Sequence, residues 1–254
     1  SRGLGDVYKR QNPNGININD NCGSTHIEGL KKVVLDNHCS LGIAYDGDGD
    51  RCLAVDEEGN EIDGDKILAI ISNYLKSKGK LKNNTVVATV MSNLGLKKYG
   101  ANNGIDIVQT KVGDRYVLEE MLKNGYNLGG EQSGHVIMLD YNPTGDGILT
   151  SLMLIRAILE SGKRASEVAS IMRAYPQVLV NAKVANEKKF DFDKDEEIVN
   201  EIKSLEKEFE GNGRVLIRTS GTEPLVRVML EGEDSQYLKT KAENLAALIS
   251  KKLG

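Results

Sequence analysis

The chain has 254 residues, of which 39% are hydrophobic and 28% are charged, and its formal net charge is −4. These proportions are typical of a soluble globular protein, and the length allows two or three small domains. The chain contains no basic tail and no run of Lys and Arg, which argues against nucleic acid as a partner. It also lacks an apolar stretch of 18 or more residues, so we expect no membrane span.

The cysteines of the chain are Cys22, Cys39 and Cys52, an odd number without the spacing of a zinc site. They predict neither a disulfide framework nor a zinc site, and they favour a reducing compartment, the cytoplasm. We expect all three to be small residues in or near the core.

Short apolar runs alternate with helical patterns through the first two thirds of the chain. The first eleven residues show no periodicity, and ordered sequence is expected from Asn12 onward. Apolar spacing and β-branched runs predict the elements that follow. They are strands over 41–45 and 52–55, a helix over 63–78, a strand over 85–90, and helices over 116–123 and 148–159, the last with Asp146 as its N-cap. This alternation predicts an α/β domain.

A break at Tyr175-Pro176 precedes a second pattern. It predicts a strand over 178–184, a helix over 195–209, strands over 214–218 and 225–230, and a helix over 235–253, which together form a small α+β domain. The first of these helices places Ile198, Ile202, Leu205 and Phe209 on one face, and the last does the same with Leu238, Ala242, Leu245 and Ile249.

An acidic turn, Asp46-Gly47-Asp48-Gly49-Asp50-Arg51, lies between two of the predicted strands. Three carboxylates two residues apart, separated by glycines that permit a tight turn, can converge on one hard cation. Without a cation such carboxylates repel one another. The turn is therefore predicted to be a divalent-metal loop, the alternative being a solvated surface turn.

A calcium-binding EF-hand is the obvious rival for this spacing. Glu57 stands at position 12 counted from Asp46, as that motif requires. Position 6, however, is Arg51 where the motif needs glycine, and residues 52–55 form a strand instead of continuing a ligand loop. The calcium interpretation is therefore rejected.

Three further loops carry polar side chains suited to ligands. Gly129-Gly130-Glu131-Gln132-Ser133-Gly134-His135 offers an acceptor, a hydroxyl and an imidazole beside a strand. Arg218-Thr219-Ser220-Gly221-Thr222-Glu223-Pro224, with Arg227 beyond it, has the hydroxyls, backbone N–H groups and guanidinium groups of a phosphate cradle. Thr110-Lys111-Val112-Gly113-Asp114-Arg115-Tyr116 places charged residues before a helix. Taken singly, each is also consistent with a structural loop.

Taken together and in this order, the loops resemble those of the α-D-phosphohexomutase superfamily. The acidic loop is similar to its metal loop, Gly130 to His135 to its sugar-binding loop, and Arg218 to Pro224 to its phosphate loop. Three segments resemble most closely the branch that acts on glucosamine phosphate, with the mannose and glucose branches as the nearest alternatives. They are Asn14 to Asn19, Cys22 to His26, and Val90 to Gly95.

The resemblance implies an enzyme that moves a phosphate between O6 and O1 of a hexose, through a phosphoserine and a bisphosphorylated sugar. It implies that Asp46, Asp48 and Asp50 hold Mg²⁺ and that Arg51 lies beside the phosphoserine. It implies that Glu131 and Ser133, with His135 close by, bind the sugar. Arg218, Ser220, Gly221, Thr222 and Arg227 would hold the phosphate that is not reacting. Lys111, Asp114 and Arg115 would contact substrate, and Asp114 is a candidate for proton transfer.

The resemblance also implies a multidomain α/β architecture. Residues 12–60 would be the remnant of a second domain, 61–174 a complete third domain with a mixed sheet, and 178–254 a small α+β domain that binds phosphate. The parent protein would be a monomer or a homodimer acting on a small phosphosugar.

One departure from the superfamily concerns the catalytic serine. Its Ser-His-Asn-Pro type of loop is absent, because Ser24-Thr25-His26 lacks the following Asn-Pro. We therefore expect this chain to be an inactive part of a longer enzyme, the alternative being a non-catalytic protein that binds metal and sugar phosphate.

Overall fold

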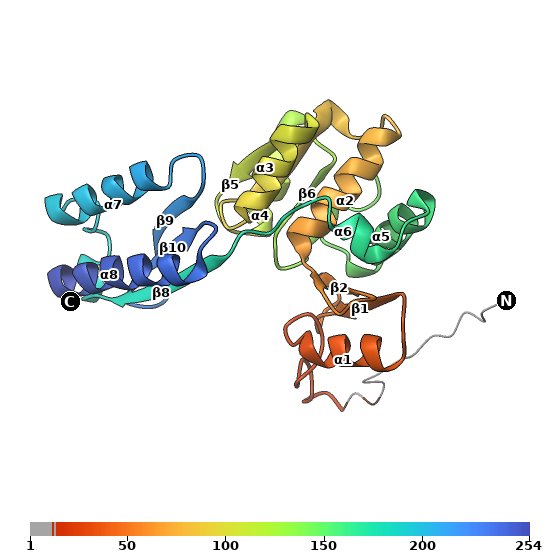
Figure 1. The fold of residues 1–254 in the computed structure, drawn as a ribbon, viewed down its shortest axis with the longest axis horizontal. Coiled ribbons are helices and arrows are strands. Elements are labelled where there is room, and N and C mark those ends of the chain that lie inside the picture. The colour runs from red at the N-terminus through yellow and green to blue at the C-terminus, as the bar shows by residue number, and fades with distance from the viewer. Residues whose placement is uncertain (1–11, 13) are drawn as a thin grey trace. The chain divides into compact units, whose positions relative to one another are not determined.

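The computed structural model describes residue 12 and residues 14–254, which form two compact units. The first unit comprises the described residues up to Ser92 together with Leu96–Arg173, and the second comprises Asn93–Gly95 and Ala174–Gly254. Both mix helices with sheets, as expected (Figure 1). None of the described helices is long and apolar enough to cross a membrane.

A small antiparallel sheet opens the first unit. Its strands are β1 (Leu41–Tyr45), β2 (Cys52–Asp56) and β3 (Glu61–Ile62), in that order, and α1 (Glu28–Asp36) packs on it. Val34 of α1 is buried against Ala44 of β1 and Val55 of β2. The last pair of the β1–β2 ladder joins Tyr45 to Cys52, so residues 46–51 form the hairpin loop.

A second sheet of this unit is mixed, and its strands have the order β5-β4-β6-β7. Its elements are β4 (Thr85–Thr89), β5 (Asp106–Thr110), β6 (Leu128–Gly130) and β7 (Val136–Met138). The first three are parallel, whereas β7 pairs antiparallel with β6. All five residues of β4 are buried, as a parallel strand covered on both faces requires.

Helices cover both faces of this mixed sheet. The helices α2 (Gly64–Ser77) and α4 (Asp114–Asn124) pack on its strands, whereas α5 (Gly147–Ser161) and the short α6 (Ala165–Ala169) pack on α2 and β2. The remaining helical elements of this part of the chain are α3 (Leu94–Asn103) and a 3₁₀ turn at Lys82–Asn84. Val86 and Ala88 of β4 belong to the large core that contains α2 and α5, whereas Val87 packs with Val117 and Met121 of α4. Alternate residues of one strand therefore face different helices.

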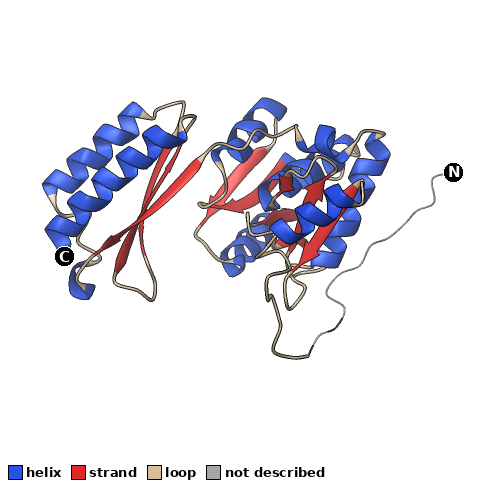
Figure 2. Ribbon diagram, turned by 60° about the horizontal axis from the view of Figure 1, so that its bottom comes forward, coloured by secondary structure: helices blue, strands red, loops and turns tan. Residues whose placement is uncertain are grey.

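The second unit is a three-stranded antiparallel sheet with two long helices on one face (Figure 2). Its elements are β8 (Gln177–Lys183), a 3₁₀ turn at Asn186–Lys188, α7 (Glu196–Glu208), β9 (Arg214–Thr219), β10 (Leu225–Glu231) and α8 (Ser235–Leu253). The strand order is β8-β10-β9. The predicted apolar faces of α7 and α8 lie in the core of this unit, with Ile202 only partly buried.

Every element predicted from the periodicity is present, with its ends shifted by at most two residues. Asp146 caps α5 as predicted, because its side chain accepts the N–H of Leu149 at 2.9 Å. The helices α1, α3 and α6 and the strands β3, β5 and β6 were not predicted.

Gly64 provides a test of how tightly this unit is packed. A Cβ at this position would lie 2.0 Å from the carbonyl oxygen of Glu131 and 2.7 Å from the N of Gly134, and backbone does not move aside as a flexible side chain does. We expect Gly64→Ala to lower the free energy of unfolding by about 2 kcal/mol, measured by urea denaturation.

Gly29→Ala in α1 is the matched control, because the atom nearest to its added Cβ is 4.0 Å away. Alanine is the better helix former by roughly 0.5–1 kcal/mol, so this variant is expected to be neutral or more stable. Equal destabilisation by the two variants would contradict the close approach of α2 to residues 131–134.

Candidate active site

The acidic loop connects β1 to β2 and forms the turn of this hairpin. One carboxylate oxygen from each of Asp46, Asp48 and Asp50 lies within 4.8 Å of the other two. Gly49 has φ of 75°, a left-handed conformation that glycine adopts without strain. The loop therefore gathers the three side chains instead of spreading them into solvent.

These carboxylates fit the requirements of a Mg²⁺ ion. Mg²⁺ takes carboxylate oxygens as ligands, and oxygens within 4.8 Å of one another are near enough to approach one ion. Burial raises the pKa of the Asp50 carboxyl, and the neighbouring Asp46 raises it further. The buried Oδ1 of Asp50 has no hydrogen-bond partner among the described residues. A bound cation would supply that partner and offset the repulsion.

Arg51 and His135 connect the acidic loop with the predicted sugar-binding loop. Arg51 pairs with His135 in an antiparallel bridge, and the N–H of Cys52 donates to the carbonyl of Gly134 at 3.1 Å. His135 is buried, and its Nε2 lies 3.5 Å from Oδ2 of Asp50. The Nε of Arg51 lies 3.6 Å from Oδ2 of Asp46, beyond hydrogen-bond distance. The structure therefore brings the two loops together, with His135 facing an aspartate of the metal loop.

Glu131 joins the sugar-binding loop to the segment that precedes α4. Its Oε1 accepts the N–H of Gly113 at 3.1 Å, and its Oε2 accepts the hydroxyl of Ser133 at 3.4 Å. Lys111 and Asp114 are exposed beside this contact. Arg115 instead forms a surface ion pair with Glu119, with its Nε 2.7 Å from the carboxylate. Of the three charged residues predicted in this segment, Arg115 is thus the one already engaged in an ion pair.

The first turn of α5 contacts the acidic loop, a role that the sequence did not reveal. The N–H of Gly147 donates to the carbonyl of Gly49 at 2.9 Å, and the hydroxyls of Tyr45 and Ser151 are 2.7 Å apart. A Cβ at Gly145 would lie 2.2 Å from Nε2 of His135. The run Thr144-Gly145-Asp146-Gly147 indicated only a helix start. Its paired glycines were the signal for this close approach.

The predicted phosphate loop belongs to the second unit. Arg218 on β9 and Arg227 on β10 stand directly opposite each other in the ladder. Burial lowers the pKa of the Arg218 guanidinium, and the charge of Arg227 lowers it further. Arg227 is only partly neutralised, because it donates to Glu223 at 3.2 Å while its buried Nε has no partner among the described residues. The loop therefore concentrates positive charge that an anion would offset.

The other predicted members of this loop follow Arg218 along the chain. Ser220 is buried and its Oγ accepts the N–H of Glu223 at 3.3 Å, whereas Gly221 and Thr222 are exposed.

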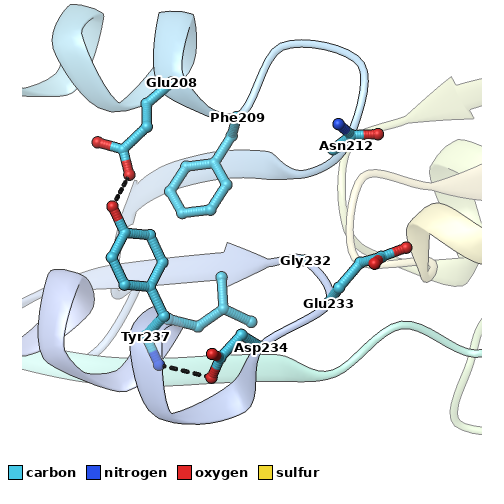
Figure 3. Close-up of a pocket in the computed structure, with 8 residues that line it drawn as sticks. Glu208, Phe209, Asn212, Gly232, Glu233, Asp234 and Tyr237 are labelled. Carbon is cyan, nitrogen blue, oxygen red and sulfur yellow. Dashed lines mark hydrogen bonds between the residues drawn. The ribbon is translucent and has the colours of Figure 1, made fainter.

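A hollow of about 380 Å³ in the second unit contains none of the predicted site residues (Figure 3). Tyr237 donates its hydroxyl to Glu208 across it, and Asp234 accepts the N–H of Tyr237 as the N-cap of α8. These polar groups already pair with one another. The hollow lies where α7 ends and α8 begins, and we assign no ligand to it.

Two family models match the chain. Residues 63–175 match the alpha/beta/alpha domain III of phosphoglucomutase/phosphomannomutase, and residues 179–248 match its C-terminal domain. The chain belongs to this family. Its members are phosphohexomutases, a class of isomerase.

Curated relatives narrow the resemblance to one branch. The chain is 59% identical over 247 residues to a phosphoglucosamine mutase of Caldicellulosiruptor saccharolyticus, covering 97% of this chain and 55% of the relative. It is 62% identical over 240 residues to one of Clostridium acetobutylicum, covering 94% of this chain and 54% of the relative. The chain thus spans about half the length of the curated relatives it matches.

Solved structures share the fold at lower identity. The N-acetylphosphoglucosamine mutase of Aspergillus fumigatus, solved with GlcNAc-6P and magnesium, matches with a TM-score of 0.72 at 21% identity, over 92% of this chain and 53% of that one. A phosphoglucomutase/phosphomannomutase family protein of Burkholderia thailandensis matches with a TM-score of 0.69 at 21% identity, over 90% and 50%.

Cys52 provides a chemical test of the junction between the metal loop and residue 134. Burial raises the pKa of its thiol to about 12, whereas Cys22 and Cys39 are half-buried. At pH 8 we expect iodoacetamide to alkylate Cys52 at least about a hundredfold more slowly than Cys39, because the thiolate is the reactive form. Peptide mapping by mass spectrometry measures the three rates.

The same raised pKa gives a pH dependence. An unfolded thiol loses its proton near pH 8.5, whereas the folded one keeps it until about pH 12. The contribution of Cys52 to stability is therefore complete below about pH 8.5 and is lost as the pH rises toward about 12. Labelling of Cys52 in the native protein as fast as that of Cys39 would contradict this packing.

Proposed function

We propose that the chain is part of a phosphoglucosamine mutase that interconverts glucosamine 6-phosphate and glucosamine 1-phosphate. The observation that carries the proposal is the convergence of Asp46, Asp48 and Asp50 beside His135 and the predicted sugar-binding loop. The identity of 58–62% to phosphoglucosamine mutases of several bacteria supports the choice of sugar. Residues 12–60 would then belong to a domain completed by other parts of the enzyme.

Phosphoryl transfer depends on positioning and on neutralising charge. Asp46, Asp48 and Asp50 would hold Mg²⁺, which supplies electrostatic stabilisation to the transferring phosphoryl group. Arg51, whose Nε has no hydrogen-bond partner among the described residues, adds a second positive charge at the same loop. Asp114 remains a candidate for proton transfer, and Lys111 and Arg115 belong to the same segment.

Glu131 and Ser133 bind sugar hydroxyls in this proposal. Glu131 is held in place by the N–H of Gly113, so its second oxygen stays directed toward Ser133. Lys111 and Asp114 lie on the segment that Glu131 holds, and they contact the substrate. In the second unit, Arg218, Ser220, Thr222 and Arg227 bind the phosphate that is not reacting.

The metal loop can be tested apart from catalysis. Asp48→Asn removes one of the three carboxylates without removing volume, and we expect it to weaken Mg²⁺ binding by about a hundredfold or more, measured by isothermal titration calorimetry. Asp36→Asn, an exposed aspartate at the end of α1, makes the same change in charge and is the matched control. Equal Mg²⁺ affinity in the two variants would remove the metal site from the proposal.

Catalysis itself requires a phosphoserine that this chain lacks. We expect the 254-residue chain alone to give no turnover of glucosamine 6-phosphate. Turnover should appear when the N-terminal half of the Clostridium acetobutylicum relative is fused to it or added in trans. Activity of the chain alone would overturn the assignment of the nucleophile.

The sugar is decided by comparing kcat/KM for glucosamine, glucose and mannose 6-phosphates in the active fusion. A higher value for mannose or glucose would make the enzyme a phosphomannomutase or a phosphoglucomutase. Binding of Mg²⁺ and glucosamine 1-phosphate without turnover in any fused form would instead indicate a non-catalytic binding protein.

A further inference from the structure

Lys189 is a buried lysine of the second unit whose burial the proposed function does not explain. It is 9% exposed and follows the 3₁₀ turn at Asn186–Lys188. Among the ion pairs of the described residues, none joins Lys189 to a carboxylate. Its ammonium group donates to the carbonyl oxygen of Ser220 at 3.3 Å and lies 5.2 Å from the ring centre of Phe190. Burying an ammonium without a counter-ion is costly, so its position calls for a compensating role.

The partner of Lys189 is the peptide group that connects Ser220 to Gly221. A trans peptide is planar, and its C=O and N–H point in opposite directions. When Lys189 draws the carbonyl of Ser220 toward itself, the N–H of Gly221 is directed to the other side of the chain. That N–H donates to no atom among the described residues, and Gly221 is exposed, with no atom within 4 Å of the position of an added Cβ.

The same loop carries two opposed guanidinium groups. Arg218 and Arg227 face each other across the β9–β10 ladder, and Glu223 neutralises only Arg227. Lys189 lies outside the segment from Arg218 to Arg227 but brings a third positive charge to it, because its ammonium group donates to the carbonyl of Ser220. A phosphate monoester is an acceptor-only dianion that takes hydrogen bonds from both guanidinium and backbone N–H donors.

We propose that Lys189 is a positioning residue of the phosphate loop, which fixes the Ser220–Gly221 peptide so that the Gly221 N–H binds a phosphate monoester together with Arg218. The inference rests on the proposed function, because it takes this loop as the site of the phosphate that is not reacting. It assigns a role to a residue that precedes Arg218, the first residue of the loop motif, by 29 positions in the sequence. Lys189 acts through the peptide and does not itself touch the ligand.

The test uses the 254-residue chain, ¹⁵N-labelled, titrated with inorganic phosphate. The Gly221 amide signal is identified by its loss in Gly221→Ala. In the wild-type chain we expect this signal to move downfield as phosphate binds. Lys189→Met should raise the Kd for phosphate about tenfold and abolish the displacement of the Gly221 signal at saturation, because the peptide is no longer oriented.

Two variants separate positioning from general effects of charge and stability. Lys188→Met removes the same charge from the exposed neighbouring lysine and should change the Kd by less than about twofold. Lys189→Arg keeps a charged donor and should restore the displacement of the Gly221 signal. The thermal unfolding midpoint of each variant is measured beside its titration, so that a loss of stability is recognised. If Lys189→Met does not fold, Lys189→Gln replaces it and is expected to raise the Kd about fivefold.

The outcomes distinguish the two levels of the proposal. If phosphate does not move the Gly221 signal of the wild-type chain, and Arg218→Ala leaves phosphate binding unchanged, the phosphate loop of the proposed function is wrong. If phosphate moves that signal and Arg218→Ala weakens binding, while the Lys189 variants bind as wild type, only the role of Lys189 is wrong. Equal weakening by Lys188→Met and Lys189→Met would reduce the effect to net charge and would also overturn it.

Discussion

Electrostatic repulsion among three aspartates is the constraint around which the first unit is organised. One carboxylate oxygen from each of Asp46, Asp48 and Asp50 lies within 4.8 Å of the other two, and burial, followed by the neighbouring Asp46, raises the pKa of Asp50. The hairpin register holds the two ends of the loop together. On the protein side, the N–H of Gly147 in the first turn of α5 donates to the carbonyl of Gly49, at the positive end of that helix. A loop free to relax would separate these charges, and the surrounding contacts prevent it.

In the second unit the repulsion is between positive charges. Arg218 and Arg227 are placed face to face by the β9–β10 register, and Lys189 is buried close to the same loop. Each unit therefore contains a cluster of like charges, carboxylates in the first unit and guanidinium groups in the second. In a chain with a net charge of −4, a local concentration of positive charge of this kind can attract an anion against the overall charge of the protein.

The apolar periodicity was sufficient to predict those helices and strands whose side chains are buried on one face or on both. The helix α8 and the strand β1 begin and end where the apolar pattern predicts, because their core-facing residues repeat at regular intervals. The helix α3 was missed because its sequence, LGLKKYGANN, contains two glycines and ends in two asparagines, so propensity does not favour a helix. The strand β5 was missed because it lies at the edge of the mixed sheet, and its residues are exposed or only half-buried. Both are stabilised by tertiary contacts.

The sequence by itself determined the fold class, the family and the chemical character of each loop, because carboxylates, guanidinium groups and glycines in a fixed order are local properties of the chain. Only the tertiary structure decided which of these groups meet. It placed His135 against Asp50 and engaged Arg115 with Glu119. It also brought Gly145 against His135 and Lys189 against the carbonyl of Ser220. These pairings join residues from different elements, and the packing of those elements depends on the whole core instead of on any local pattern.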